Sequence, residues 1–557
     1  MHLTWTLSQL INQREYGETE KIVLEYFFTN INKNVYCAKD TLPSQVWAFL
    51  MWQYSRSHLS LRDRFLKVFE DQKVAFEAWK IWKDEFISLE DLAEYIKSNN
   101  DNKLQYFYDR AASFLKKWWV EYWHNSLKDS DYIRFAVEGV SEVLTKVIES
   151  PFPALWAFQE TSTRYMPFSK DHILIPEEIS NSPFAEEVRE KLFTLFDVYE
   201  KWLVVVKEAL LSNGIFKQED FSSLGSFNTT LNTKVFDICR YLLPSATATK
   251  LWCSFQTRTL ESHLSWMLSH PLAEARMVAK AIWEEAIKIS PWLLSHVWIN
   301  DYEINRISST YNIVNDIFKV EEKIYKGIPS SDRVKIIKID DLDTEVVAWL
   351  IFESSRTSWK SYFECLNYAK GLTDSDKRKI MDSALLTRGK FDRMPRSILH
   401  TRVISEFLMD FWAYRDLQRH RASDQIWQWV TSIHWYDYPE YIDLPWMESF
   451  KEMYDAVMTD ITLLSRKLTK QYPYAIEYIA ALGHLVRSTF EMDAGQFAYV
   501  IELRTTPHAH HSYRNLLISL YEQVKEVSPI FASYIRCWSG DASRKEEAER
   551  IESNKSK

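Results

Sequence analysis

Glycine is scarce in this sequence, which contains 10 glycines among 557 residues, about 2% against a usual ~7%. The two that lie closest together are Gly214 and Gly225. Dinucleotide-binding fingerprints, P-loops and kinase glycine-rich loops all need clustered glycines, because the backbone must approach phosphate closely. The sequence therefore excludes these three motifs, and side chains must hold most of the charge of any bound phosphate.

Cysteine and long apolar runs are also in short supply. The five cysteines are scattered and never spaced as CxxC, which predicts a reducing, cytoplasmic environment and no disulfide or zinc framework. No apolar run approaches ~18 residues and the N-terminus lacks a signal-peptide pattern, so we expect no membrane association. The 68 Lys+Arg and 77 Asp+Glu leave a net charge of −9 without a basic block. This charge disfavours nucleic acid as a partner.

What the sequence does contain is helical periodicity, with 46% hydrophobic and 15% aromatic residues. Apolar residues recur at helical spacing over 188–206, 272–289 and 516–527, and such stripes predict amphipathic helices. Apolar β-branched runs predict strands at Val334–Ile339 and Val346–Ile351, whereas residues 132–140 and 497–503 suit either a strand or a buried helix. The fold class is therefore predicted as α+β and predominantly helical.

A spacing of 238 residues relates the two halves of the chain. Three pairs of identical residues share it: His270 and His508, Arg276 and Arg514, and Pro291 and Pro529. The spacing predicts two tandem repeats. We expect residues 1–300 to hold an N-terminal extension and the first repeat, residues 301–535 the second repeat, and residues 536–557 a charged, disordered tail.

Four polar clusters can carry chemistry. They cover residues 159–165, 256–260, 415–421 and 502–514. The cluster at 415–421 suits a solvated helix face on which Asp416 pairs with His420. Alternatively, Arg419 and Arg421 can clamp a pyrophosphate, because arginine binds phosphate in a bidentate manner without help from glycine.

The other clusters leave similar alternatives. Ser162 and Arg164 suit either a helix cap beside a surface charge or a grip on a phosphoryl group. Arg258 and Arg504 lie beside apolar residues, so each either extends to solvent or forms a buried anion site. The histidines near position 510 lack a carboxylate partner at metal-binding spacing, and we expect no metal.

Together the clusters resemble the motifs of the flavin-dependent thymidylate synthases. That family's Glu-x-Ser-x-Arg-Tyr motif is matched in full by Glu160-Thr161-Ser162-Thr163-Arg164-Tyr165, and its Arg-His-Arg motif by Arg419-His420-Arg421. Its Arg-Ser-Leu segment resembles Thr257-Arg258-Thr259-Leu260. Its Leu-Arg segment resembles Leu503-Arg504 and the residues up to Arg514, with His510 where the family has Gln. Each half keeps motifs that the other lacks, as in an enlarged tandem form of the family.

The resemblance implies the reductive methylation of dUMP to dTMP, with FAD as cofactor and methylenetetrahydrofolate and NADPH as co-substrates. It implies catalytic roles for Arg504 and Ser162, and substrate binding by Arg164, Arg258 and Tyr165. The flavin would be contacted by Arg419, His420, Arg421 and Glu160.

The family forms homotetramers with active sites between subunits, so we expect this chain to self-associate as a dimer of tandem chains. Two alternatives remain. One is a degenerate homologue that binds flavin or nucleotide without turnover, and the other is a helical interaction scaffold.

Overall fold

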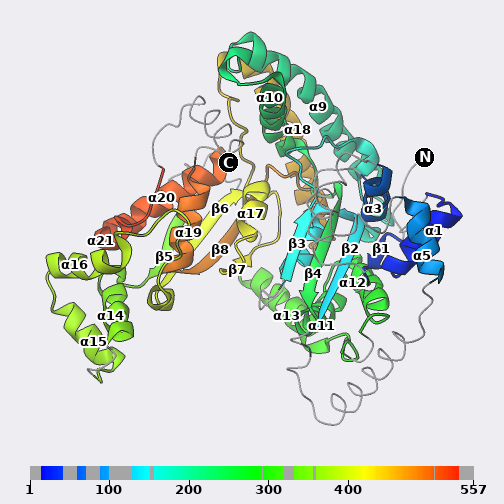
Figure 1. Cartoon of the computed structure of the whole chain (residues 1–557). Coiled ribbons are helices and arrows are strands. Elements are labelled where there is room, and N and C mark those ends of the chain that lie inside the picture. The colour runs from blue at the N-terminus through cyan, green and yellow to red at the C-terminus, as the bar shows by residue number, and fades with distance from the viewer. Residues whose placement is uncertain are drawn as a thin grey trace. The chain divides into compact units, whose positions relative to one another are not determined.

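The computed structural model describes residues 14–39, 41, 59–70, 88–98, 128, 131–150, 156–290, 293–318, 332–355, 359–506 and 509–538. The chain divides into two compact units (Figure 1). The first unit contains residues 1–200, 243–322 and 467–479, and the second contains residues 201–242, 323–466 and 480–557. Each unit therefore includes a segment from the other half of the sequence.

The first unit is built on an antiparallel sheet of four strands. These are β1 (Val35–Cys37), β2 (Tyr132–Ser141), β3 (Trp156–Glu160) and β4 (Ala248–Gln256), in the order β1-β2-β4-β3. The pairing of β2 with β4 shifts register between Glu138 and Val140. Gly139 lies at this bulge with a φ of 68°, a backbone conformation that glycine adopts without steric cost.

The second unit repeats this sheet. Its strands are β5 (Val334–Ile339), β6 (Arg402–Asp410), β7 (Asp424–Trp427) and β8 (Leu485–Asp493), in the order β5-β6-β8-β7. The first pair of strands is again irregular, between Ile336 and Lys338. Two sheets of the same order, each combined with helices, confirm the prediction of a tandem α+β fold.

Helices surround both sheets. In the first unit they are α1 (Glu18–Phe27), α3 (Leu61–Glu70), α5 (Leu89–Ser98), α7 (Glu142–Ile148), α8 (Glu177–Ser180), α11 (Thr257–Leu268), α12 (Ala273–Ala286) and α13 (Asp301–Ile317). In the second they are α10 (Leu224–Cys239), α14 (Leu342–Ser354), α15 (Tyr362–Lys370), α16 (Asp374–Leu385), α17 (Phe411–Gln418), α19 (Ala494–Arg504), α20 (His511–Val527) and α21 (Pro529–Ala532). The helices α9 (Ala185–Ser212) and α18 (Glu448–Leu468) have residues in both units. The sheets contact α11 and α12 in the first unit and α19 and α20 in the second.

The predicted elements are largely confirmed. The stripes at 188–206, 272–289 and 516–527 lie in α9, α12 and α20, and a strand spans Val334–Ile339. The ambiguous segment 132–140 is strand β2, and 497–503 is part of helix α19. The strand predicted at Val346–Ile351 is wrong, because these residues lie in α14. Asp341 caps that helix by accepting a hydrogen bond from the Thr344 amide at 3.1 Å.

Equivalent caps relate the two repeats residue by residue. Ser141 ends β2 and accepts a hydrogen bond from the Leu144 amide at the start of α7, as Asp410 ends β6 and accepts one from the Ala413 amide at the start of α17. The Ser141 hydroxyl also donates to Glu274 on α12 at 2.6 Å. In the second unit the roles are reversed, because the Ser512 hydroxyl on α20 donates to Asp410. One carboxyl–hydroxyl pair is therefore conserved between the repeats with its partners exchanged.

The segment of the second half that lies in the first unit is anchored by buried polar contacts. The Glu477 carboxylate forms an ion pair with Lys146 at 2.5 Å, with both side chains at most 2% exposed. The Tyr478 hydroxyl donates to the Glu274 carboxylate at 2.6 Å. In the second unit the reciprocal segment places the Arg240 guanidinium 4.3 Å from the ring centroid of Trp412.

The predicted tail is only partly visible, since residues 536–538 are described and residues 539–557 lie outside the described residues. Among the described helices, none is both long and apolar enough to cross a membrane.

Candidate functional site

In the first unit, the Glu-x-Ser-x-Arg-Tyr motif forms the end of β3 and the turn that follows. Glu160 is the last residue of the strand and is buried, opposite Leu251 on β4. The Ser162 hydroxyl accepts a hydrogen bond from the Arg164 amide at 3.3 Å, and the Ser162 carbonyl accepts one from the Tyr165 amide at 3.2 Å. Ser162 is half-buried and the ring of Tyr165 is 46% exposed. The turn therefore presents its hydroxyl and aromatic groups near solvent.

Arg258 lies at the other end of the same sheet. It is exposed, at the second position of α11 and beyond Gln256, the last residue of β4. Leu251, which faces Glu160, precedes Gln256 by five residues, or about 17 Å of strand at ~3.3 Å per residue. Within this unit the structure does not bring Arg258 to the Ser162 turn.

In the second unit, the structure does bring predicted residues together. Arg504 ends helix α19, and its Nε donates a hydrogen bond to Nε2 of His420 at 2.8 Å. Its Nη2 donates to the carbonyl oxygen of Asp416 at 3.0 Å. The guanidinium also lies 5.5 Å from the ring centroid of Tyr513 on α20, at cation–π distance. Three contacts thus fix a half-buried arginine beside the Arg-His-Arg motif.

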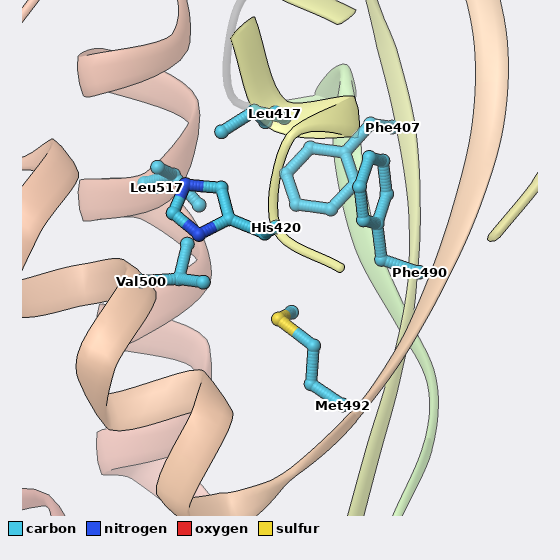
Figure 2. Close-up of a pocket in the computed structure, with 7 residues that line it drawn as sticks. All are labelled: Phe407, Leu417, His420, Phe490, Met492, Val500 and Leu517. Carbon is cyan, nitrogen blue, oxygen red and sulfur yellow. The ribbon is translucent and has the colours of Figure 1, made fainter. Parts of the chain in front are cut away.

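The His420 ring lies in a small apolar pocket (Figure 2). The pocket is lined by side chains from the sheet and from α17, α19 and α20, namely Phe407, Leu417, Phe490, Met492, Val500 and Leu517. Burial, reinforced by the positive charges of Arg504 and Arg419, lowers the pKa of His420 to about 3. The ring is therefore neutral near pH 7. Because Nε2 accepts a hydrogen bond, its proton is on Nδ1.

Arg504 has no acidic partner in the part of the chain that the structure describes. Its printed contacts are with a neutral imidazole, a carbonyl oxygen and an aromatic ring. Two of its five N–H groups are used in these bonds. The arrangement fixes the position of the guanidinium and leaves donors and a full positive charge to bind an anion.

The interpretation of residues 415–421 as a solvated helix face is wrong for Arg415 and His420, which are both buried. Helix α17 ends at Gln418, so Asp416 and His420 do not share a regular helix. The Asp416 carboxylate instead lies 3.9 Å from Arg419. The Arg419 side chain is 37% exposed and Arg421 is also exposed, so these two arginines flank a buried histidine at the surface.

The caps of α11 and α19 show which residues replace the missing motifs. Gln256 and Asp493 cap these helices, and counting from them makes Gly495 the equivalent of Arg258 and Met267 the equivalent of Arg504. Here the repeats are related by 237 residues, one fewer than the spacing of the matching histidines. Strand pairing gives the same shift and makes Trp427 the equivalent of Glu160, because they face Ser488 and Leu251 respectively.

Sequence reasoning missed two parts of the arginine site. Neither the Asp416 carbonyl oxygen nor Tyr513 carries a motif, and both lie far along the chain from the cluster that contains Arg504 or its histidine partner. The sequence contains a signal only for Tyr513, which immediately precedes the Arg514 that repeats Arg276.

Fold and site define a tandem α+β protein whose second repeat presents fixed arginines suited to an anionic ligand. Residues 66–292 match the model of a family described as thymidylate synthase complementing protein. This match confirms the motif resemblance. The chain therefore belongs, through its first repeat, to the flavin-dependent thymidylate synthases, as an enlarged tandem form.

Relatives of similar length exist in other organisms. A UPF0159 protein of Chlamydia pneumoniae is 25% identical over 545 residues, which are 94% of this chain and 95% of that protein. A UPF0159 protein of Thermoplasma acidophilum is 22% identical over 461 residues, covering 77% and 89%. Among solved structures, the UMP/dUMP methylase PolB of Streptomyces cacaoi aligns with 10% identity and a TM-score of 0.28, over 36% of this chain and 93% of that one.

Proposed function

We propose that this protein is an FAD-dependent thymidylate synthase that converts dUMP to dTMP, with methylenetetrahydrofolate as the carbon donor and NADPH as the reductant. The family match over residues 66–292 supports the reaction class. The observation that carries the proposal is Arg504, a fixed cation whose contacts to His420 and Asp416 leave its charge uncompensated.

Arg504 would act on the pyrimidine. Carbon 5 of uracil becomes nucleophilic only when negative charge develops on the ring oxygens, and a preorganised cation at those oxygens stabilises that charge. The neutral state of His420 serves this role, because a protonated histidine could not accept the Arg504 hydrogen bond and would repel its guanidinium.

The first repeat would bind the rest of the substrate. The Ser162 hydroxyl and the Arg164 guanidinium are donors for dUMP, and the exposed ring of Tyr165 can stack on the pyrimidine or the folate. Arg258 would contact the nucleotide phosphate. Because Arg258 and Ser162 are at opposite ends of one sheet, we propose that complete sites combine residues of different repeats.

The flavin would be held through its phosphates. The exposed guanidinium groups of Arg419 and Arg421 suit a diphosphate, and Glu160 would line the same site. The pocket around His420 contains about 210 Å³ of empty space including its mouth, below the ~300–1,000 Å³ typical of ligand pockets. The residues thus fit the phosphate end of FAD rather than its ring. When bound, FAD supplies the hydride transfer that protein side chains cannot perform.

Tritium release from dUMP labelled at carbon 5 tests the proposal, since methylation at that carbon displaces its hydrogen. The full chain is incubated with FAD, NADPH and methylenetetrahydrofolate. We expect release by the wild type, and a kcat lower by about 100- to 1,000-fold for Arg504→Ala, the cost of removing one donor to a developing oxyanion.

The matched control is Arg306→Ala, which removes an exposed arginine of α13 paired with Glu303 and should leave turnover unchanged. Flavin bands without tritium release would contradict the proposal and favour the degenerate homologue. A colourless protein that does not bind added FAD would contradict it in favour of the interaction scaffold.

A further inference from the structure

The turn of α19 that carries Arg504 is held from outside by residues 534–538, which we call the C-terminal strap. The Arg536 amide donates a hydrogen bond to the Glu502 carboxylate at 3.2 Å, and the Trp538 amide donates to the Thr505 hydroxyl at 3.1 Å. Arg514 on α20 donates to the Trp538 carbonyl at 2.9 Å. The strap thus binds the last two turns of the helix and the residue that follows it.

The first repeat contains the same strap. There the Trp298 amide donates to the Ser265 hydroxyl at 3.3 Å, and the Asn300 amide donates to the Ser269 hydroxyl at 2.7 Å. Trp298 and Asn300 precede Arg536 and Trp538 by 238 residues. Ser265 and Glu502 are each the ninth residue after the helix cap. The strap is therefore part of the repeated fold and does not by itself distinguish the site.

The second repeat differs at one point of this contact, where Glu502 replaces the serine. Glu502 forms a bidentate pair with Arg388, in which Nη1 donates to Oε2 at 3.2 Å and Nη2 donates to Oε1. Arg388 Nη2 also donates to the Tyr534 carbonyl of the strap at 3.2 Å. The two side chains are only 7% and 15% exposed. A shielded ion pair thus links the helix end, the strap and the loop after α16.

We propose that the Arg388–Glu502 pair is a positioning device that holds the last turn of α19 so that Arg504 stays against His420. This inference rests on the proposed function of Arg504. Residues two apart on a helix do not face each other, so Glu502 acts through the backbone rather than by touching Arg504. Helix ends fray because their last carbonyl groups lack intrahelical partners, and the pair counteracts that fraying at the turn where the arginine must be fixed. The first repeat, which has Met267 instead of Arg504, makes do with serine.

Glu502→Ser is the sharpest variant, because it installs the residue of the first repeat and keeps an acceptor for the strap. We expect kcat for tritium release to fall about tenfold, since a displacement of about 1 Å can cost up to 100-fold, with the KM for dUMP nearly unchanged. Arg388→Lys keeps the charge but loses the bidentate geometry, and its kcat should lie between those of Glu502→Ser and the wild type.

A second readout does not depend on turnover. In protein labelled with ¹⁵N-histidine, the wild-type His420 should show a neutral ring with its proton on Nδ1. Loss of the Arg504 contact in Glu502→Ser should shift the Nε2 signal toward that of a ring without a donor. This measurement separates the two proposals, because a wild type without activity would contradict the proposed function while the His420 signal still decides the positioning role.

The matched control is Glu406→Ser, which breaks the Arg487–Glu406 pair in the same unit. Glu406 precedes the pocket residue Phe407 on β6, so it points to the opposite face of the sheet. This variant should change neither kcat nor the His420 signal. An unchanged His420 signal in both Glu502→Ser and Arg388→Lys would overturn the inference, as would an active Glu502→Ser enzyme with wild-type kcat.

Discussion

The two repeats share a strand order and capping positions, but they differ at matching positions of α11 and α19. The first repeat has exposed Arg258 near the start of its helix and buried Met267 near the end. The second has Gly495 near the start and Arg504 at the end. The difference shows that one fold can support an anion site at either end of this helix. It also shows that neither repeat keeps both sites.

Packing explains why the positions cannot simply be restored. A Cβ at Gly495 would lie 2.7 Å from Leu399 Cδ2 and 3.4 Å from Met394 Cβ, so the loop after α16 fills the space that an arginine would need. Met267 is fully buried. Each lost residue has been replaced by one that fits its apolar neighbours, and the repeats are now specialised.

Exchanging the residues at the helix ends should give the largest effect. Met267→Arg would bury an unpaired charge, and we expect the free energy of unfolding to fall by about 3–5 kcal/mol or more. The reciprocal Arg504→Met removes a half-buried side chain and should change stability by less than about 1.5 kcal/mol while abolishing turnover. Urea denaturation of both variants checks the comparison, and equal stabilities would contradict the assigned equivalence.

The buried pair of Lys146 and Glu477 should come next. Removing one partner, as in Glu477→Ala, leaves an uncompensated buried charge, so we expect a loss of about 3–5 kcal/mol. The double variant Lys146→Met, Glu477→Leu should recover most of that stability, because apolar residues of similar volume replace a buried ion pair well.

The control for this pair is Lys467→Ala in the same unit. It breaks the exposed pair with Glu187, whose side chains are 50% and 41% exposed, and should cost about 0–1 kcal/mol. If Glu477→Ala costs no more than this control, the segment 467–479 does not depend on the buried pair for its place in the first unit.

The reversed carboxyl–hydroxyl pairs make stability depend on pH. Burial, together with the nearby Asp437 carboxylate, raises the pKa of Asp410 to about 7, above the ~3.9 of an unfolded aspartate. The native state thus keeps a proton that the unfolded chain releases, so Asp410 contributes a loss of stability as the pH rises from about 4 to above 7.

Asp410→Asn should therefore match the wild type near pH 4 and be more stable at pH 8, on the order of 2 kcal/mol. Asparagine can still cap α17, because it offers an acceptor to the Ala413 amide. Glu274→Gln should shift stability in the same direction, since burial also raises the pKa of Glu274. Thermal melts at several pH values measure this, and parallel profiles for wild type and Asp410→Asn would rule out the raised pKa.

Much of the fold could be predicted because helices with one apolar face leave a clear period in the sequence. The error at Val346–Ile351 has a physical reason. Val346, Val347 and Leu350 are all buried in α14, and a short run that is apolar on every side looks the same in a buried helix and a buried strand.

The site could be predicted residue by residue but not as an arrangement. The motifs identified His420 and Arg504, which are 84 residues apart and meet only because β8 lies between β6 and β7 and leads into α19. The separation of Arg258 from Ser162 depends in the same way on the register of β3 against β4. No local pattern encodes either outcome, nor the pairing of Glu502 with Arg388 across 114 residues.

The smallest expected effect concerns the glycine that replaces Arg258. Gly495→Ala adds a methyl group against Leu399 and the cap residue Asp493, whose Oδ1 would lie 3.2 Å away, and such overpacking costs about 1–3 kcal/mol. Gly225→Ala is the control, because a Cβ on this glycine of α10 would meet only the Ser223 hydroxyl at 3.9 Å. Alanine there should stabilise the helix by up to ~1 kcal/mol. Chemical denaturation should therefore give changes of opposite sign. A stabilising Gly495→Ala would mean that the loop after α16 yields readily, and that an arginine could be restored in the second repeat.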